Sequence, residues 1–272
     1  MLYDLTIEAI QHDLPTTVIG RAVRHYAQVG STNDLAREQA RAGHAEGLTL
    51  VADEQTSGRG RMGRGWAAPP GSSLLLSVLL RPSWLAPADS FALTMLAGVA
   101  LCEAIEQATP LQTALKWPND LLLQVYTTTG PDLRKAAGVL SEIELSDGAI
   151  AWVIMGIGVN VNWAPHGIVD GQDLSATATS IGTALGAPIE RLTLLRALLL
   201  RLDQRYAALR VGDMAELFAA WRTRLTTLGQ PVNVRLPQGQ LAGIAEDVDP
   251  SGALRVRDAS GVLHTVLAGD VV

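Results

Sequence analysis

The chain has 272 residues, of which 48% are hydrophobic, and its 21 basic and 27 acidic side chains give a formal charge of −6. This composition supports a folded core and excludes a largely disordered chain. The acidic balance argues against a protein that mainly coats nucleic acid or an anionic membrane.

The start of the chain shows no sign of export. It lacks the basic residues and the apolar run of a signal peptide. The longest mostly apolar stretch, residues 149–164, is shorter than the roughly 20 residues that a membrane helix needs. The single cysteine, Cys102, has no partner for an internal disulfide, which is typical of a reducing compartment. We therefore expect a cytoplasmic protein without membrane contact.

Hydrophobic patterning predicts a mixed α/β region that ends near residue 228. Residues 2–26 are weakly patterned and predict an arm and a first strand. Thr32 is expected to cap a helix over residues 33–41, which Gly43 ends. A long amphipathic helix is expected over residues 87–107. The remaining expected elements are strands at 49–52, 73–80, 113–117, 120–126, 136–145 and 150–162, a hairpin tip at 127–131, and helices at 190–209 and 213–225.

The last part of the chain predicts a small β domain. Short strand-like runs at 232–236, 241–247, 253–258 and 262–267 alternate with turn sequences rich in Pro, Gly and Ser. Such even spacing is typical of a small barrel. The expected fold class is a mixed-sheet α/β (α+β) domain over residues 1–228, followed by a small β-barrel over residues 229–272.

The segment 55–66, QTSGRGRMGRGW, carries the strongest chemical signal. Three arginines and four glycines lie within nine residues, and no acidic residue occurs from residue 55 to residue 88. Glycine lets a backbone approach a ligand closely, and arginine offers paired donors to phosphate oxygens. The pattern favours an anion-binding loop, and a solvated basic loop without function is the alternative.

A dinucleotide-binding fold does not explain this segment. Gly58, Gly60 and Gly63 match the G-x-G-x-x-G pattern, but that fold needs a helix directly afterwards and an acidic residue about 20 positions on. Pro69 and Pro70 follow instead, and the next acidic residue is Asp89. The chain has no P-loop sequence either, so a nucleotide would have to bind in another way.

The lysines form a second signal. The chain has only two, Lys116 and Lys135, because 19 of its 21 basic residues are arginine. Lys116 begins the sequence KWPND and Lys135 begins KAAGVLSE, so we expect both on neighbouring strands of one hairpin. An ammonium group is a compact charge suited to a single phosphate or carboxylate oxygen. A general bias towards arginine, with two lysines close by chance, is the alternative.

Two further segments are weaker signals. In residues 156–162, GIGVNVN, alternation buries the apolar side chains and leaves glycine and asparagine on the other face, where a flat ligand could approach. An ordinary strand that ends in an asparagine turn explains this run equally well. In residues 30–34, GSTND, a helix cap suffices as an explanation.

Together these segments resemble the biotin–protein ligases, also called biotin–[acetyl-CoA-carboxylase] ligases. The matching stretches are 30–33, 55–66, 116–120, 135–142 and 156–160, in the family's order, and residues 243–254 resemble its SH3-like carboxyl-terminal barrel. The resemblance implies that biotin and ATP, normally with Mg²⁺, form biotinyl-5′-adenylate and pyrophosphate. The biotinyl group then passes to a lysine of the biotin carboxyl carrier protein of acetyl-CoA carboxylase.

The resemblance also implies roles for individual residues. Those implied to bind biotin are Ser31, Thr32, Asn33, Gln55, Gly58, Arg59, Gly60, Arg61, Lys135, Gly138 and Gly156. Those implied to bind ATP are Arg61, Arg64, Trp66, Lys116, Asn119, Lys135 and Asn160. Lys135, Arg61 and Arg59 are the implied catalytic residues, and Asp120 is the implied magnesium ligand. No histidine lies in these segments, so the base for acyl transfer stays unassigned.

The chain departs from the family pattern in two places. Only about 25–30 residues precede Ser31, too few for the DNA-binding module of the family's repressor members, so we expect no DNA partner. The hairpin between Leu123 and Arg134 is several residues longer than the family pattern, which bears on the placement of Lys135. Both a monomer and a homodimer are compatible with the sequence.

Three alternatives compete with a biotin ligase. A lipoate–protein ligase has related architecture and the same adenylate chemistry. A protein that binds biotin without turnover and an RNA-binding arginine loop are the others. The two alternatives without catalysis leave the lysines and the glycine–asparagine strand without a role. The RNA-binding alternative also lacks a ladder of aromatic residues beside the arginines.

Overall fold

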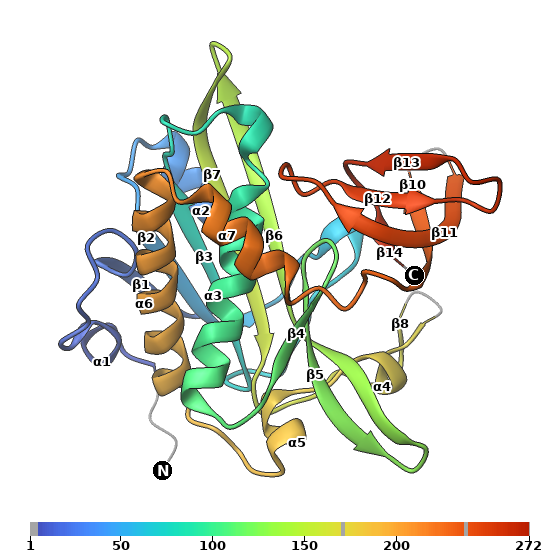
Figure 1. The fold of residues 1–272 in the computed structure, drawn as a ribbon. Coiled ribbons are helices and arrows are strands. Elements are labelled where there is room, and N and C mark those ends of the chain that lie inside the picture. Colours follow the sequence, from blue (N-terminus) through green and yellow to red (C-terminus); the bar gives the residue numbers. More distant parts are fainter. Residues whose placement is uncertain (1–4, 170–171, 237–238, 272) are drawn as a thin grey trace.

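The computed structural model describes residues 5–169, 172–236 and 239–271, which form a large mixed-sheet part and a small β part (Figure 1). The large sheet has the strand order β1-β2-β3-β7-β6-β5-β4. β1 and β2 are parallel, and the other neighbours are antiparallel. Its strands are β1 (Ala22–Val29), β2 (Leu48–Gln55), β3 (Ser73–Leu80), β4 (Thr113–Lys116), β5 (Asp120–Thr127), β6 (Gly130–Ser146) and β7 (Ala149–Asn160).

Helices pack on both faces of this sheet. α3 (Ala92–Ala108), α6 (Arg191–Arg210) and α7 (Met214–Arg222) lie together over one face (Figure 1). α2 (Thr32–Arg41) contacts β2, β3 and β7. The shorter elements are α1 (Ile7–Gln11), α4 (Leu174–Thr177), α5 (Ile181–Leu185), β8 (Ile168–Val169), β9 (Gln172–Asp173) and the 3-10 turns η1 (Arg61–Gly63) and η2 (Pro87–Asp89).

The alternation of side chains along β3 separates two apolar clusters. Leu76 and Val78 belong to the main core with α3 and α6, whereas Leu79 belongs to a smaller cluster with residues of α2. Ser77 interrupts the apolar side chains, and its hydroxyl donates a hydrogen bond to Asn33 Oδ1 on α2. The α2 face of the sheet is therefore partly polar at its centre.

Helix α3 is not the amphipathic helix that the sequence predicts. Of its 17 residues 13 are buried, because the sheet lies on one side of it and α6 and α7 on the other. The run Pro87–Ala108 is long and apolar enough to cross a membrane by length and composition alone. Because 72% of its most apolar window is buried inside the described molecule, the run is explained as a core helix.

The expected strands form, with corrections at the hairpin. β6 begins at Gly130 rather than at residue 136, and the register runs from Thr127↔Gly130 to Leu122↔Lys135 before a bulge. The lysines do not lie on neighbouring strands. Lys116 on β4 is opposite Asp120, and Lys135 on β6 pairs with the other edge of β5. One strand thus separates the two lysines.

The other differences concern short elements. Ser31, not Thr32, takes the N-cap position of α2, because the backbone becomes helical at Thr32. The weakly patterned start holds α1 as well as β1. Between β7 and α6 the structure has β8, β9, α4 and α5, where the sequence predicts no element. These four elements have five residues or fewer each, too short for a periodic signal.

The small part is a five-stranded antiparallel sheet in the order β13-β12-β11-β10-β14. Its strands are β10 (Pro231–Leu236), β11 (Gly239–Val248), β12 (Leu254–Arg257), β13 (Leu263–Val266) and β14 (Asp270–Val271). The four expected strands are present, and β14 is additional. In the part of the chain that the structure describes, β13 and β14 are the two edges of this sheet, so closure into a barrel stays a prediction.

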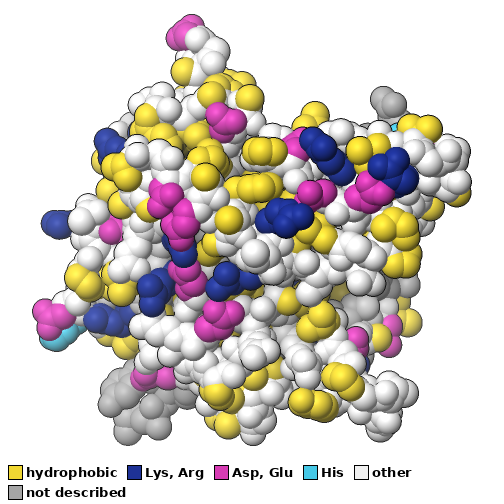
Figure 2. Space-filling model, in the orientation of Figure 1, with side chains coloured by type: hydrophobic (Ala, Val, Ile, Leu, Met, Phe, Trp, Pro, Cys, Tyr) yellow, Lys and Arg dark blue, Asp and Glu magenta, His cyan; other side chains and the backbone are white. Residues whose placement is uncertain are grey.

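The helical face carries mixed charges rather than one basic patch (Figure 2). Arg205 on α6, for example, forms ion pairs with Glu103 and Glu216. The fields of two opposite charges that lie side by side largely cancel at the distance from which a nucleic-acid phosphate would act on them.

Candidate active site

The expected site residues meet on the α2 face of the large sheet. The start of α2, the ends of β2 and β7, the middle of β6 and the beginning of β5 all contribute side chains. The loop of residues 58–66, which we name the arginine loop, connects β2 to the strands that follow. The chain therefore brings five separate sequence segments into one place.

A polar network holds the start of α2. Gln55 Oε1 accepts hydrogen bonds from the backbone nitrogen of Thr32 at 2.7 Å and from its hydroxyl at 3.0 Å. Ser77 Oγ lies 2.8 Å from Thr32 Oγ1 and donates to Asn33 Oδ1 at 2.6 Å. Ser31, Thr32 and Asn33 are all buried. These short polar side chains can exchange hydrogen bonds with the donors and acceptors of a small polar ring.

Asn33 links this network to charged residues. Its amide nitrogen donates to Glu142 Oε1 at 3.0 Å, and Glu142 forms an ion pair with Arg37. Gly156 makes room for Asn33, because a Cβ at that glycine would lie 2.2 Å from Asn33 Oδ1. The sequence predicts that a ligand approaches Gly156 closely. In the structure the side chain that approaches it closely is Asn33.

The arginine loop is a small closed turn. Trp66 donates its backbone N–H to Gly58 O at 2.9 Å, and Gly60 donates to Arg64 O at 2.7 Å. Met62 at the tip has a φ of 53° and is 52% exposed. A Cβ at Gly58 would lie 2.3 Å from Trp66 O, so a larger residue would break the closure. Gly58 is therefore required for the closure of this loop.

Carboxylates hold the three loop arginines. Arg59 makes a two-pronged pair with Asp34, at 2.9 Å and 2.5 Å. The Arg59 hydrogen bond is the main reason why the pKa of Asp34 lies below its usual value. Arg61 and Arg64 both contact Asp270 on β14, and Arg61 also donates to Gly269 O at 3.0 Å. The loop is tied to α2 on one side and to the small sheet on the other.

Trp66 and Lys135 lie together over glycines. A Cβ at Gly158 would lie 2.6 Å from the Trp66 indole, and one at Gly138 would lie 3.3 Å from Lys135 Nζ and 3.4 Å from the indole. Lys135 Nζ lies 5.7 Å from the centre of the Trp66 ring and 2.6 Å from Asp120 Oδ1. An ammonium beside a carboxylate and an indole is positioned to bind an anion next to a flat base.

Lys116 lies in the same charged group. Its pKa is lowered, first by burial and then by the nearby Lys135 and Arg64, while Asp120 and Asp270 act in the opposite direction. Four cationic side chains, Arg61, Arg64, Lys116 and Lys135, thus lie around two carboxylates, Asp120 and Asp270. The net charge of +2 makes this part of the site suited to a polyanion.

Two asparagines of the site, Asn119 and Asn160, form hydrogen bonds with backbone groups of neighbouring segments. Asn119 donates from its side chain to Val139 O at 2.7 Å and accepts from Val139 N at its own carbonyl at 3.0 Å. Asn160 is buried and donates to Thr179 O at 3.0 Å. Within the described residues, Asn160 Oδ1 is a buried acceptor without a hydrogen bond. Such an acceptor is expected to receive a donor from a ligand or a water molecule.

Sequence reasoning missed Ser77, Glu142, Gly158 and Asp270. Glu142 and Gly158 lie inside segments that it singled out, and the alternation of β6 and β7 places each on the same face as Gly138 and Gly156. Ser77 is a polar residue in an otherwise apolar strand, SLLLSVLL, which could have marked it. Nothing in the sequence points to Asp270, because it lies more than 200 positions from the arginines that it contacts.

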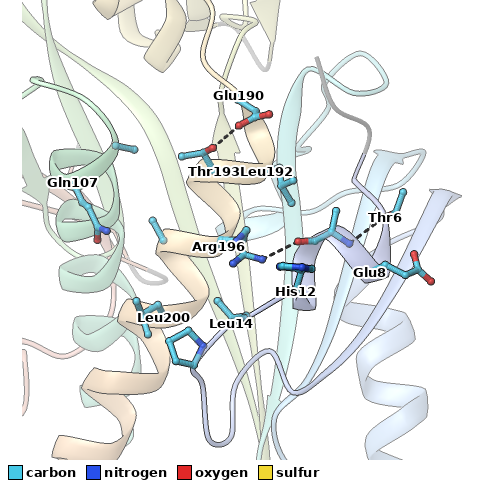
Figure 3. Close-up of a pocket in the computed structure, with 14 residues that line it drawn as sticks. Thr6, Glu8, His12, Leu14, Gln107, Glu190, Leu192, Thr193, Arg196 and Leu200 are labelled. Carbon is cyan, nitrogen blue, oxygen red and sulfur yellow. Dashed lines mark hydrogen bonds between the residues drawn. The ribbon is translucent and has the colours of Figure 1, made fainter. Parts of the chain in front are cut away.

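A cavity of the described structure lies elsewhere. It has a volume of about 800 Å³ and is bounded by α1, α3 and α6, with Leu14, Arg196 and Leu200 on its wall (Figure 3). None of the expected site residues lines it. At the site itself, the Trp66 indole lies against the glycines and the arginines lie against carboxylates, so side chains of the chain take up the space.

The sequence matches two family profiles. The Biotin/lipoate A/B protein ligase family matches residues 26–160, and the Biotin protein ligase C terminal domain matches residues 227–272. The biotin–[acetyl-CoA-carboxylase] ligase of Mycobacterium tuberculosis is 36% identical over 90% of this chain and 86% of that protein. This chain belongs to the biotin protein ligase family. The same-named enzyme of Paracoccus denitrificans is 33% identical over 86% of this chain and 94% of its own length.

Solved biotin protein ligases share the fold. The ligase of Aquifex aeolicus in complex with biotin and ATP superposes with a TM-score of 0.74 and 27% identity, over 93% of this chain and 98% of that one. The resemblance to the biotin protein ligases and the mixed α/β fold class are therefore confirmed. The roles of individual residues stay predictions, which the geometry above makes specific.

Proposed function

We propose that this chain activates biotin with ATP to biotinyl-5′-adenylate and transfers the biotinyl group to a lysine of the biotin carboxyl carrier protein of acetyl-CoA carboxylase. The observation that carries this proposal is the meeting of the arginine loop, Lys135 and Trp66 over the glycines of β6 and β7. The relatives named above, whose names state biotin and acetyl-CoA carboxylase, support the choice of substrate and acceptor.

The biotin ring is assigned to the polar network at the start of α2. Ser31, Thr32, Asn33 and Gln55 present hydroxyl and amide groups that match the carbonyl and N–H groups of a ureido ring. Gly58, Gly60, Gly138 and Gly156 are assigned to the same wall of the site, where Gly58, Gly138 and Gly156 let Trp66, Lys135 and Asn33 approach the backbone. The biotin carboxylate would then point towards Lys135, with the arginine loop above it.

The phosphates are assigned to the cationic group. Attack of the biotin carboxylate on the α-phosphate brings two anions together, and Lys135, Arg59 and Arg61 are the proposed catalytic residues that offset their repulsion. In this step the carboxylate oxygen forms a bond to the α-phosphorus, and the bond to pyrophosphate breaks. Lys116, Arg64, Asn119 and Asn160 are assigned to the nucleotide, and the Trp66 indole to its base.

Magnesium fits the site as a ligand of the nucleotide. The described residues hold no cluster of three or more His, Cys, Asp or Glu side chains. Magnesium bound to a nucleotide often takes only one or two protein carboxylates, its other ligands being phosphate and water. Asp120, which lies at 2.6 Å from Lys135 Nζ, would be that carboxylate. The ion would supply further positive charge to the phosphates.

The acyl transfer requires a neutral acceptor amine. The lysine of the carrier protein has an ordinary pKa of about 10.4, so it must lose its proton before it attacks the anhydride. Closure of the arginine loop over the adenylate would keep water from hydrolysing it first. Among the described residues, no histidine forms a hydrogen bond or ion pair with Lys135, Trp66 or the loop arginines, so the base stays unassigned.

Three further assignments complete the proposal. The catalytic domain comprises residues 1–228 and the carboxyl-terminal domain residues 229–272, which the profile match to residues 227–272 supports. The cytoplasm is the proposed compartment, because the single cysteine, Cys102, is buried and suits a reducing environment. A monomer and a homodimer are both compatible with the proposed reaction.

The deciding experiment is ATP–pyrophosphate exchange with biotin, with lipoate and without an acid. Exchange that depends on biotin, followed by labelling of a carrier domain, is the expected result. Exchange with lipoate alone would replace biotin by lipoate as the substrate. If the chain binds biotin but shows no exchange, it is a binding protein without this activity. If it shows neither biotin binding nor exchange, the proposal is overturned.

A further inference from the structure

Asp270 of the small sheet is a site carboxylate to which neither the sequence signals nor the family resemblance assigns a role. It lies on β14, where Asp270 pairs with Arg235 of β10, and its side chain is only 7% exposed. Its Oδ1 accepts from Arg61 Nε at 3.4 Å, and its Oδ2 accepts from Arg64 Nη2. One buried carboxylate therefore holds two arginines of a loop that begins more than 200 residues earlier.

The position of this carboxylate is firmly set. A Cβ at the preceding Gly269 would lie 2.8 Å from Val234 and 3.0 Å from Arg235 O, so the backbone there packs closely on β10. The arginine loop, by contrast, has open space around it. A Cβ at Gly63 or Gly65 would meet no atom within 4 Å. A fixed carboxylate thus holds two arginines beside a part of the loop, at Gly63 and Gly65, that has open space around it.

The contacts of Asp270 leave donors on each arginine. Arg61 uses Nε and Nη2 for Asp270 and Gly269 O, and Arg64 uses Nη2 for Asp270 and Nε for Arg61 O. Within the described chain, Nη1 of both arginines makes no hydrogen bond. Asp270 therefore orients the two guanidinium groups and leaves one nitrogen on each for a phosphate oxygen.

Asp270 also compensates charge. Arg61, Arg64, Lys116 and Lys135 carry four positive charges, and without Asp270 only Asp120 would oppose them. Like charges at this spacing repel each other and would separate the loop from the sheet. The carboxylate keeps the cations together while their net charge stays positive.

We propose that Asp270 is a positioning residue of the nucleotide site: it orients Arg61 and Arg64 for the phosphates of ATP and ties the arginine loop to the small sheet. The inference rests on the proposed function, and it makes the small sheet part of the nucleotide site. Asp270 acts through the arginines and does not touch the nucleotide.

The test compares Asp270→Asn with the wild type in biotin-dependent ATP–pyrophosphate exchange. The expected result is a KM for ATP raised about tenfold, the size of the loss of one charge-assisted hydrogen bond to an orienting group. The affinity for biotin, measured by calorimetry without nucleotide, is expected to change less than twofold. Asp270→Glu is expected to recover part of the ATP affinity, because it keeps the charge.

Asp247→Asn is the matched control. Asp247 lies on β11 of the same sheet and pairs with Arg222, away from the arginine loop. Its substitution is expected to leave the KM for ATP unchanged. A double variant, Asp270→Asn with Arg64→Gln, tests whether Asp270 acts through Arg64. If it does, Arg64→Gln raises the KM for ATP much less in the Asp270→Asn enzyme than in the wild type.

Two results would overturn the inference. One is an Asp270→Asn enzyme whose KM for ATP stays within twofold of the wild type. The other is a loss of ATP affinity that is matched by the loss of biotin affinity and accompanied by a lower melting temperature. This result would show a purely structural role. If the wild type itself shows no exchange, the proposed function fails, and direct calorimetry of ATP binding to both forms still decides the role of Asp270.

Discussion

At the scale of single residues, the site needs glycines because they have no side chain, and it needs a lysine because of its charged side chain. Gly156 and Gly158 are needed because side chains of other segments, Asn33 and Trp66, approach their backbone. Lys135 is needed for its compact charge, which lies beside Asp120 and the Trp66 ring. Each kind of residue gives a separate prediction.

Lys135→Gln is expected to lower the rate of biotin-dependent exchange at least 100-fold, in the range seen when one charge-stabilising group is removed. The cause is loss of the cation between the two reacting anions. Lys135→Arg should fail to restore the rate, because the wider guanidinium does not fit between Gly138 and Asp120. Arg134→Gln is the control, since among the described residues its side chain forms hydrogen bonds only with Ser175 O and Asp132. A Lys135→Gln enzyme near wild-type rate would refute this role.

Gly158→Ala is expected to displace the Trp66 indole and to raise the KM for ATP about tenfold, since overpacking costs roughly 1–3 kcal/mol. The new methyl group would lie 2.6 Å from an indole carbon. Steady-state exchange kinetics would measure the effect, with urea unfolding as a check of stability. Gly30→Ala is the control, because a Cβ there meets nothing within 4 Å. Equal ATP kinetics in all three proteins would show that Trp66 does not bind the base.

At the scale of elements, the long β5–β6 hairpin leaves the site in place. The extra residues extend the antiparallel pairing to Thr127↔Gly130, beyond Lys135, which stays opposite Leu122. Tyr126 near the tip is 83% exposed and Leu133 43% exposed. The added length thus projects away from the sheet rather than into the site (Figure 1).

Tyr126→Ser is therefore expected to change the free energy of unfolding by less than about 0.5 kcal/mol, as usual for surface substitutions. Exchange activity should also stay within twofold of the wild type. Urea unfolding and the exchange assay measure both quantities. A large loss of activity with unchanged stability would show that the hairpin tip takes part in catalysis, for example by contacting the carrier protein.

At the scale of the whole molecule, the KWPND segment joins the two parts of the protein. Trp117 is almost fully buried, and its indole donates to Gly252 O at 2.9 Å. Its backbone nitrogen donates to Thr227 Oγ1 at 3.0 Å. Gly252 in turn lies against α3, since a Cβ there would lie 2.0 Å from Phe91. Thus Lys116 serves the site, and its neighbour Trp117 holds the small sheet against the large part.

Trp117→Phe is expected to lower the free energy of unfolding by about 1–3 kcal/mol, because Gly252 O loses its buried donor. The folded enzyme should keep its KM for biotin. Thermal and urea unfolding measure the stability, and Trp163→Phe, at a half-buried position, is the matched control. Loss of less than 0.5 kcal/mol would show that other contacts hold the two parts together.

The sequence by itself determined the longer elements and the segments that meet at the candidate site. Runs such as α6 and β3 were predictable, because their apolar residues are bounded by turn residues and the length of each run distinguishes a helix from a strand. The arginine loop, both lysines and the glycine–asparagine strand were recognisable because their chemistry is local to short segments. Short elements such as β8 and α4 were not, since so few residues carry no period.

Only the tertiary structure decided which residues complete the site. Asp270 meets Arg61 and Arg64, Glu142 meets Asn33, and β5 lies between the strands of the two lysines. The burial of α3 on all sides likewise depends on α6 and α7. The physical reason is the same in each case: contacts between residues far apart in the chain depend on strand order and packing, which no local pattern of side chains contains.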